Sequence, residues 1–140
     1  KFITLLLFIF SLQQSLSQSI VSCDSLTFES DRQKIDTSRY FLLTTAIADT
    51  TSLIVIGTVI DQYTGKPIKN AEVLLGIKDG NLEDKSMCDT KGNFKVSLFD
   101  GNDDKQYLKI TSPEYKCLLI DNFEFRGANF FEIIIKLNPN

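Results

Sequence analysis

Alternation of apolar and polar residues recurs in short segments from Leu53 onward, and it constrains the fold more than any other feature. In "FKVSL", Phe94, Val96 and Leu98 alternate with polar residues, and in "FFEIIIKL" at 130–137 every second residue is apolar. Because successive side chains of a strand point to opposite faces, this period of two predicts strands with one buried face.

Turn signals separate these segments. "QYTGKP" contains Gly65, which permits a positive φ, and a proline, and Asp61 can accept backbone N–H bonds in the turn that it opens. "DTKGN" at 89–93 predicts a hairpin turn with Gly92 in the left-handed region. Six or seven strands at intervals of about ten residues, without a helical pattern, predict a seven-stranded antiparallel Greek-key β-sandwich.

One predicted strand, "LIVIGTVID" at 53–61, is apolar on both faces. A strand of this kind is typical of a sheet that is covered on both sides. The apolar segment 39–48 is a candidate cover, and its ten residues are compatible with either an added strand or a short helix.

The N-terminal segment carries a targeting pattern. Residues 1–17 begin with Lys1, continue with an apolar run too short to span a bilayer, and end in small polar residues. This pattern predicts a signal peptide cleaved before Gln18, although a buried core helix is the alternative. We therefore expect a tether with a possible extra strand at 18–52, a sandwich at 53–140, and export to the periplasm, outer membrane or cell surface.

The three cysteines leave several outcomes open. "IVSC" ending at Cys23 fits a lipoprotein signal, so Cys23 is a lipidation candidate and would be the membrane attachment. Strand phase counted across the turn at 89–93 predicts that Cys88 points outward. Cys117 is in phase with Tyr115 and Leu119, which predicts that it points inward. Opposed side chains cannot form a disulfide without backbone movement, so we expect free thiols.

Composition excludes several classes of function. The chain has 140 residues, a formal net charge of −3 and no histidine. Without imidazole, Ser-His-Asp and Cys-His catalysis and histidine-based zinc sites are not available. No two basic residues are adjacent, so we expect no nucleic-acid partner. We also expect no cofactor and no metal site; the acidic loop 100–105 has oxygen ligands but lacks the glutamate of a calcium-binding loop.

The turns and strands together resemble the carboxypeptidase regulatory-like domain, a transthyretin-like β-sandwich. The resemblance covers roughly 53–137 and rests on "GTVIDQYTGKPIKNAEVLL", "DTKGNFKVSL" and "PEYK". Cys88 stands where that family usually has threonine. The resemblance implies a domain that is usually non-catalytic and that occurs in exported bacterial proteins.

We therefore expect a non-enzymatic module of the bacterial cell envelope that binds a protein partner, with a carbohydrate-binding accessory domain as the alternative. The aromatic loop "NFEFRGANFF" is the candidate binding site, since loops on a rigid sandwich often carry binding. Its candidate residues are Phe123, Phe125, Arg126 and Phe130. A glycan would stack on such rings, whereas a protein partner would use an exposed strand edge.

Overall fold

The computed structural model describes residues 22–28, 36–37, 39–47, 52–78, 80, 82–99, 106–123 and 128–140, which form ten β-strands and no α-helix. The predicted signal peptide at 1–17 lies outside these ranges. Within them, no helix has the length and apolar character needed to cross a membrane.

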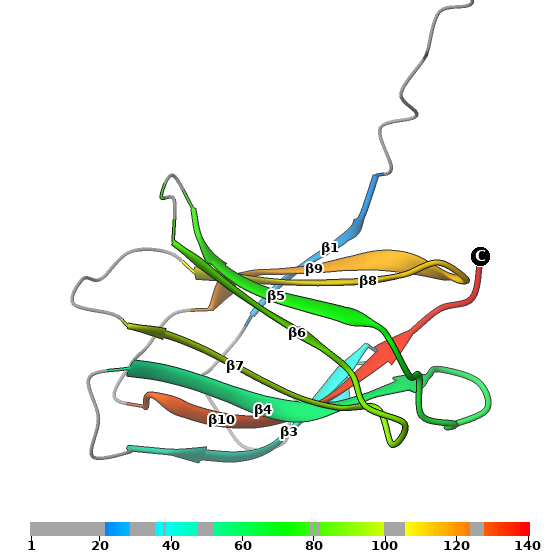
Figure 1. Cartoon of the computed structure of the whole chain (residues 1–140), viewed down its shortest axis with the longest axis horizontal. Coiled ribbons are helices and arrows are strands. Elements are labelled where there is room, and N and C mark those ends of the chain that lie inside the picture. The colour runs from blue at the N-terminus through cyan, green and yellow to red at the C-terminus, as the bar shows by residue number, and fades with distance from the viewer. Residues whose placement is uncertain are drawn as a thin grey trace, which may run out of the picture.

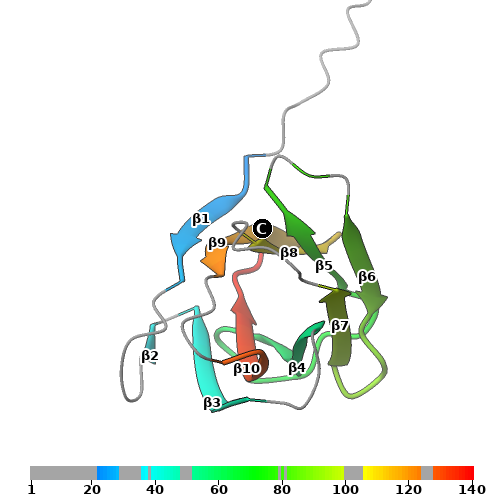
Figure 2. The same ribbon diagram turned by 90° about the vertical axis from the view of Figure 1, so that its left-hand side faces the viewer.

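The strands form two stacked five-stranded sheets (Figures 1 and 2). The first sheet, in spatial order, consists of β1 (Asp24–Thr27), β9 (Tyr115–Phe123), β8 (Gln106–Ser112), β5 (Glu72–Ile77) and β6 (Glu83–Met87). The second consists of β2 (Asp36–Thr37), β3 (Tyr40–Ala46), β10 (Phe130–Leu137), β4 (Ser52–Asp61) and β7 (Asn93–Phe99).

Both sheets are mixed, which refines the expected architecture. The all-β sandwich is confirmed, but strand β1 pairs with β9, and β10 with β4, in parallel. The remaining pairs are antiparallel. The expected seven antiparallel strands are therefore too few, because short polar segments such as β1 ("DSLT") carry no alternation that reveals them.

The core lies between the sheets and is formed by the alternating residues that the sequence predicted to face inward. Val73, Val96 and Ile133 are completely buried. The other fully buried large side chains come from nearly every strand: Tyr40, Leu53, Leu75, Leu108, Ile110, Leu118, Ile120, Phe131, Ile135 and Leu137. Both sheets contribute, so the apolar faces seal each other from water.

The predicted turn residues act as expected in local structure. The Asp61 carboxylate accepts hydrogen bonds from the backbone N–H groups of Tyr63 and Thr64, at 2.8 and 2.9 Å. Gly65 and Gly92 both have positive φ, at 69° and 75°. These conformations are accessible to glycine at no steric cost, which explains its presence in both turns.

Two sequence-based expectations about connections are wrong. The segment 89–93 does not close a hairpin within one sheet: β6 belongs to the first sheet and β7 to the second, so the chain crosses the sandwich there. Segment 39–48 does not cover the outer face of β4, because β3 pairs edge to edge with β10 in the same sheet. In both cases the local pattern identifies a turn or a strand but not the sheet that receives it.

Candidate functional site

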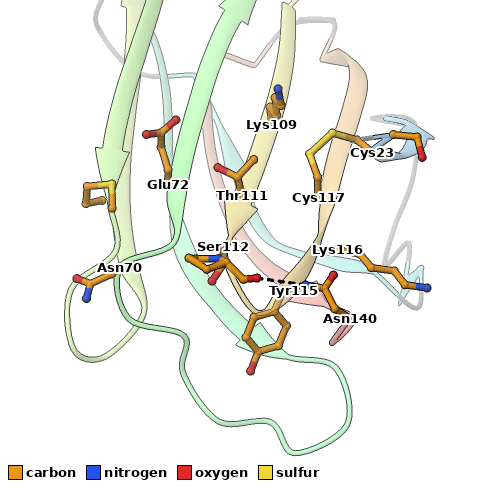
Figure 3. Close-up of a pocket in the computed structure, with 13 residues that line it drawn as sticks. Cys23, Asn70, Glu72, Lys109, Thr111, Ser112, Tyr115, Lys116, Cys117 and Asn140 are labelled. Atoms are coloured by element: carbon orange, nitrogen blue, oxygen red, sulfur yellow. Dashed lines mark hydrogen bonds between the residues drawn. A yellow bond between two sulfur atoms is a disulfide. The ribbon is translucent and has the colours of Figure 1, made fainter. Parts of the chain in front are cut away.

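A groove of about 640 Å³ lies on the outer face of the first sheet, at the end where β8 turns into β9 (Figure 3). Its lining comes from β5, β6, β8 and β9 and from both chain-terminal segments of the described structure. The lining residues are Ser22, Cys23, Asn70, Glu72, Met87, Lys109, Thr111, Ser112, Pro113, Tyr115, Lys116, Cys117 and Asn140.

The register of the strands places the central groups of the groove. Thr111 on β8 is directly opposite Glu72 on β5, and Glu72 is opposite Met87 on β6. In Figure 3, Thr111 lies between Glu72 and Cys117. Lys109 lies two residues back along β8 and therefore shares this outer face with Thr111. The floor thus combines a carboxylate, a hydroxyl and an ammonium group.

Apolar groups flank these polar groups on two sides. Met87 is 57% exposed at one side, and Pro113 and the Cys23–Cys117 disulfide bound the other. The Asn140 side chain donates a hydrogen bond to the Pro113 carbonyl oxygen at 3.2 Å, which fixes the last residue against the β8–β9 turn. An apolar enclosure with a few polar groups is the usual composition of a small-molecule site.

One residue at the rim has an unusual backbone. Asn70 has φ of 60°, and no other described non-glycine residue has a positive φ. Its N–H donates to the Cys88 carbonyl oxygen, and the Cys88 N–H donates to that of Ala71, so the turn is held against the end of β6. Asparagine tolerates the left-handed region better than most residues, and strained positions of this kind cluster at functional sites.

Tyr115 connects the groove to the opposite sheet. Its hydroxyl donates to the Asp61 carboxylate at 2.9 Å, which links β9 to β4 across the end of the sandwich. The Thr64 N–H is the main cause that lowers the pKa of Asp61; burial opposes it, and the bonds from Tyr63 and Tyr115 add to it. Burial, followed by the bond to Asp61 and its charge, raises the pKa of Tyr115.

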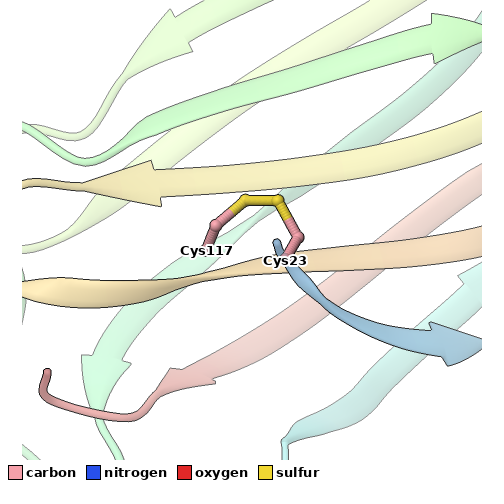
Figure 4. The surroundings of a disulfide bond; sticks show 2 residues. All are labelled: Cys23 and Cys117. Carbon is pink, nitrogen blue, oxygen red and sulfur yellow. A yellow bond between two sulfur atoms is a disulfide. The ribbon is translucent and has the colours of Figure 1, made fainter. Parts of the chain in front are cut away.

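A disulfide joins Cys23 to Cys117, with a Cα–Cα distance of 4.5 Å (Figure 4). It connects the residue before β1 to the third residue of β9, and the strands continue from there as a parallel pair. The expectation of free thiols is therefore wrong for Cys117. A lipidated Cys23 would carry a thioether on the same sulfur, so the disulfide and lipidation are alternatives, and lipidation stays a prediction.

The predicted directions of Cys88 and Cys117 are reversed. Cys88 lies in the core with 3% exposure, whereas Cys117 shares the outer face of β9 with the groove. For Cys88, the prediction extended one strand phase through the turn at 89–93, but the chain changes sheets at that turn. For Cys117, it took the phase of Tyr115 and Leu119 as the inner one, whereas Leu118 and Ile120 are the completely buried residues of β9. Cys88 is a free thiol, and burial, together with the charge of Asp89, raises its pKa to about 11.

The described ends of the predicted aromatic site lie at the opposite end of β9 from the groove. Phe123 ends β9, at the opposite end of that strand from Tyr115, and Phe130 is a half-buried residue that begins β10. Phe125 and Arg126 lie outside the described residues. Binding at this loop therefore stays a prediction. The sequence does not predict the groove, because Asn70, Thr111 and Asn140 come from distant segments and no local motif joins them.

The described residues do not offer a metal site. Within them, no group of three histidine, cysteine, aspartate or glutamate side chains could hold a metal ion. The whole sequence contains no histidine, which is the commonest ligand for transition metals.

Comparison with known proteins identifies similar folds among solved enzymes. The structure resembles catechol 1,2-dioxygenase from Acinetobacter radioresistens, with a TM-score of 0.51, 13% identity and coverage of 66% of this chain and 53% of that one. It also resembles catechol 1,2-dioxygenase from Pseudomonas arvilla C-1, with a TM-score of 0.50, 10% identity and coverage of 82% and 56%. No protein-family model and no curated protein sequence matches the chain.

These findings correct three expectations. The two solved structures named above are catechol 1,2-dioxygenases and not carboxypeptidase regulatory-like domains, so the expected kinship with the latter family is wrong. Two further expectations depended on that assignment: that the chain is a non-catalytic envelope module, and that it is not an enzyme. Both are corrected for the same reason. At this identity the similarity establishes the fold alone, and the chain spans little more than half the length of these enzymes.

Proposed function

We propose that the groove on the outer face of β8 binds a small hydroxylated aromatic compound, the chemical class to which catechol belongs. A volume of about 640 Å³ lies within the usual range of small-molecule sites and accommodates a single substituted ring. The solved enzymes of similar fold are named for their action on catechol, which supports this class of ligand.

The observation that carries the proposal is the opposition of Glu72 and Thr111 beneath apolar walls. An ionised carboxylate accepts hydrogen bonds at both oxygens, so Glu72 suits a ligand with two adjacent hydroxyl donors. Met87 and the Cys23–Cys117 disulfide provide soft apolar contacts for the ring. Together these groups match a flat apolar body with a polar edge.

No oxidative step is assigned to these residues. Chemistry with O₂ is carried by a metal or an organic cofactor, with the protein supplying binding and orientation. The residues present do not fit a metal site, since the sequence lacks histidine and the described part of the chain has no group of three candidate ligands. The proposal therefore concerns uptake and orientation of the aromatic compound.

Chemical-shift mapping with isotopically labelled protein tests the proposal. We expect catechol to shift the amide resonances of Thr111, Tyr115 and Asn140 with a dissociation constant of about 0.1 to 1 mM, as a ligand of so few atoms allows. Thr111→Phe fills the centre of the groove and should weaken binding at least about tenfold.

A matched control uses the other sheet. Thr58 is a half-buried residue on β4, outside the groove. Thr58→Phe should leave the catechol shifts intact, and circular dichroism should show that both variants fold. Saturable shifts confined to the 123–130 end, or equal binding by the two phenylalanine variants, would contradict the assignment of the groove.

We also propose that the chain is exported, as the pattern of residues 1–17 predicts. The Cys23–Cys117 disulfide supports this, because disulfides persist in oxidising compartments and are rare in the cytosol. Mass spectrometry of the protein from its native cells should give a chain beginning at Gln18 and two hydrogens lighter than the reduced form. A lipid adduct at Cys23 would instead confirm lipidation and exclude the disulfide.

A further inference from the structure

A second hollow of about 370 Å³ continues from the groove along the outer face of the first sheet. It is lined by Lys78, Tyr107, Leu119 and Asp121, and it shares Cys23 and Lys109 with the groove. The two hollows are therefore adjacent, with Cys23 and Lys109 at their common border.

The floor of the second hollow is aromatic. Tyr107 on β8 is directly opposite Gly76 on β5, and a Cβ at position 76 would meet the Tyr107 ring at 2.6 Å. The Tyr107 ring therefore lies over Gly76, and any side chain at position 76 would collide with it. Leu119 on β9 is opposite Lys109 and adds an apolar side chain to the same surface.

The two lysines of the second hollow differ in their ion pairing. The Lys78 ammonium lies 3.1 Å from the Asp121 carboxylate, so this pair compensates itself. Lys109 is exposed, and among the described residues no carboxylate lies within ion-pair distance of its ammonium group. An ammonium group that has no described carboxylate within ion-pair distance, between two hollows, attracts an anionic group of a bound molecule.

We infer that the ligand of the groove carries an anionic group, such as a carboxylate, which lies beside Lys109. This inference rests on the proposed function and adds the charge and length of the ligand. Thr111 and Lys109 are two residues apart on one strand face, a separation of about 7 Å. A tail of about three carbon atoms on the ring spans that distance.

The test compares two probes that differ only in charge: dihydrocaffeic acid, whose ring carries a three-carbon acid, and its primary amide. With the wild-type protein at low ionic strength, we expect the acid to bind about three- to fivefold more tightly than the amide, the range of a partly exposed ion pair. High salt should reduce this preference.

Two variants assign the preference to a residue. Lys109→Met retains the length of the side chain without its charge, and it should bring the acid-to-amide ratio below about twofold. Lys85→Met, on the outer face of β6 and outside both hollows, should retain the full preference.

The outcomes separate this inference from the proposed function. Equal binding of acid and amide to the wild-type protein, or an unchanged preference in Lys109→Met, overturns the anionic subsite while leaving the aromatic groove in place. If neither probe nor catechol itself shifts the groove resonances, both proposals are wrong.

Discussion

The two faces of the first sheet contrast sharply although the same strands form them. On the inner face, Ile110 and Leu118 are completely buried against the second sheet. On the outer face, the neighbouring residues Lys109 and Cys117 line a groove. One residue of displacement along a strand thus separates a position in the core from one that lines the groove.

This contrast implies that stability and binding can be altered separately. Substitutions on the inner face remove buried apolar contacts and should lower the free energy of unfolding. Substitutions on the outer face change a partly solvated surface, where most effects on stability are within about 0.5 kcal/mol. Ile110→Ala, Lys109→Met and Glu72→Gln test this separation directly. The Cys23–Cys117 disulfide is the exception on the outer face, because a cross-link stabilises by restraining the unfolded chain.

Ile110→Ala should lower the free energy of unfolding by about 2 to 5 kcal/mol, because it leaves a cavity beneath β8. Lys109→Met, the adjacent residue on the other face, should change stability by less than about 0.5 kcal/mol. Urea denaturation measures both. A similar loss in the two variants would show that the faces of β8 are not independent.

Removal of the disulfide by the double substitution Cys23→Ser/Cys117→Ser should cost about 2 to 4 kcal/mol. The cross-link closes a long loop, since the two cysteines are separated by 94 positions in the sequence. Thermal denaturation should show the loss, and catechol affinity should fall because one wall of the groove is released. Unchanged stability in the double variant would show that the parallel pairing of β1 with β9 holds β1 without the cross-link.

Asp61 should make stability depend on pH. The pKa of Asp61 is lowered in the folded protein, so its contribution is fully present above the ordinary carboxyl pKa near 4 and is lost as the pH falls through the lowered value. The difference in melting temperature between wild type and Asp61→Asn should therefore shrink in acid. Tyr115→Phe removes one donor and should give an intermediate gap near neutral pH.

The dependence of stability on alkaline pH tests the same Tyr115–Asp61 hydrogen bond independently. Because the pKa of Tyr115 is raised, its stabilising bond is present below the ordinary tyrosine pKa near 10 and is lost as the pH rises through the raised value.

The acid experiment has a clear contrary outcome. A difference in melting temperature between wild type and Asp61→Asn that stays constant from neutral pH down into strong acid would rule out a stabilising role for the ionised carboxylate.

Glu72→Gln should have the smallest effect. The substitution retains the size of the side chain on the outer face of β5 and removes its charge, so the free energy of unfolding should stay within about 0.5 kcal/mol of wild type. Catechol affinity should fall about three- to tenfold, because a charged acceptor is replaced by a neutral one. Calorimetric titration measures the change; an unaltered affinity would remove Glu72 from the site.

Much of the fold follows from the sequence because burial on one face leaves a period of two. Phe94, Val96 and Leu98 were expected inside, and all three are buried. The turn roles of Asp61 and Gly65 are equally local and were also predicted correctly. These features depend on interactions between residues that are close in the chain.

The errors arise where a segment chooses between sheets. The turn at 89–93 was expected to return the chain to the same sheet, and its actual crossing reverses the inferred direction of Cys88. The Cys23–Cys117 pair depends on the parallel contact of β1 with β9, which no local pattern encodes. The groove has the same origin, since its residues come from strands and segments that are far apart in the sequence and meet only in the folded sheet.

The buried thiol of Cys88 has a practical consequence for following the protein in solution. With its pKa raised to about 11 and its sulfur enclosed in the core, it stays protonated and out of reach of alkylating reagents while the sandwich is closed. Once Cys23 and Cys117 are paired, this single reactive sulfur labels only molecules that have opened. The rate at which Cys88 is alkylated therefore reports how often the interior is transiently exposed, without an added probe.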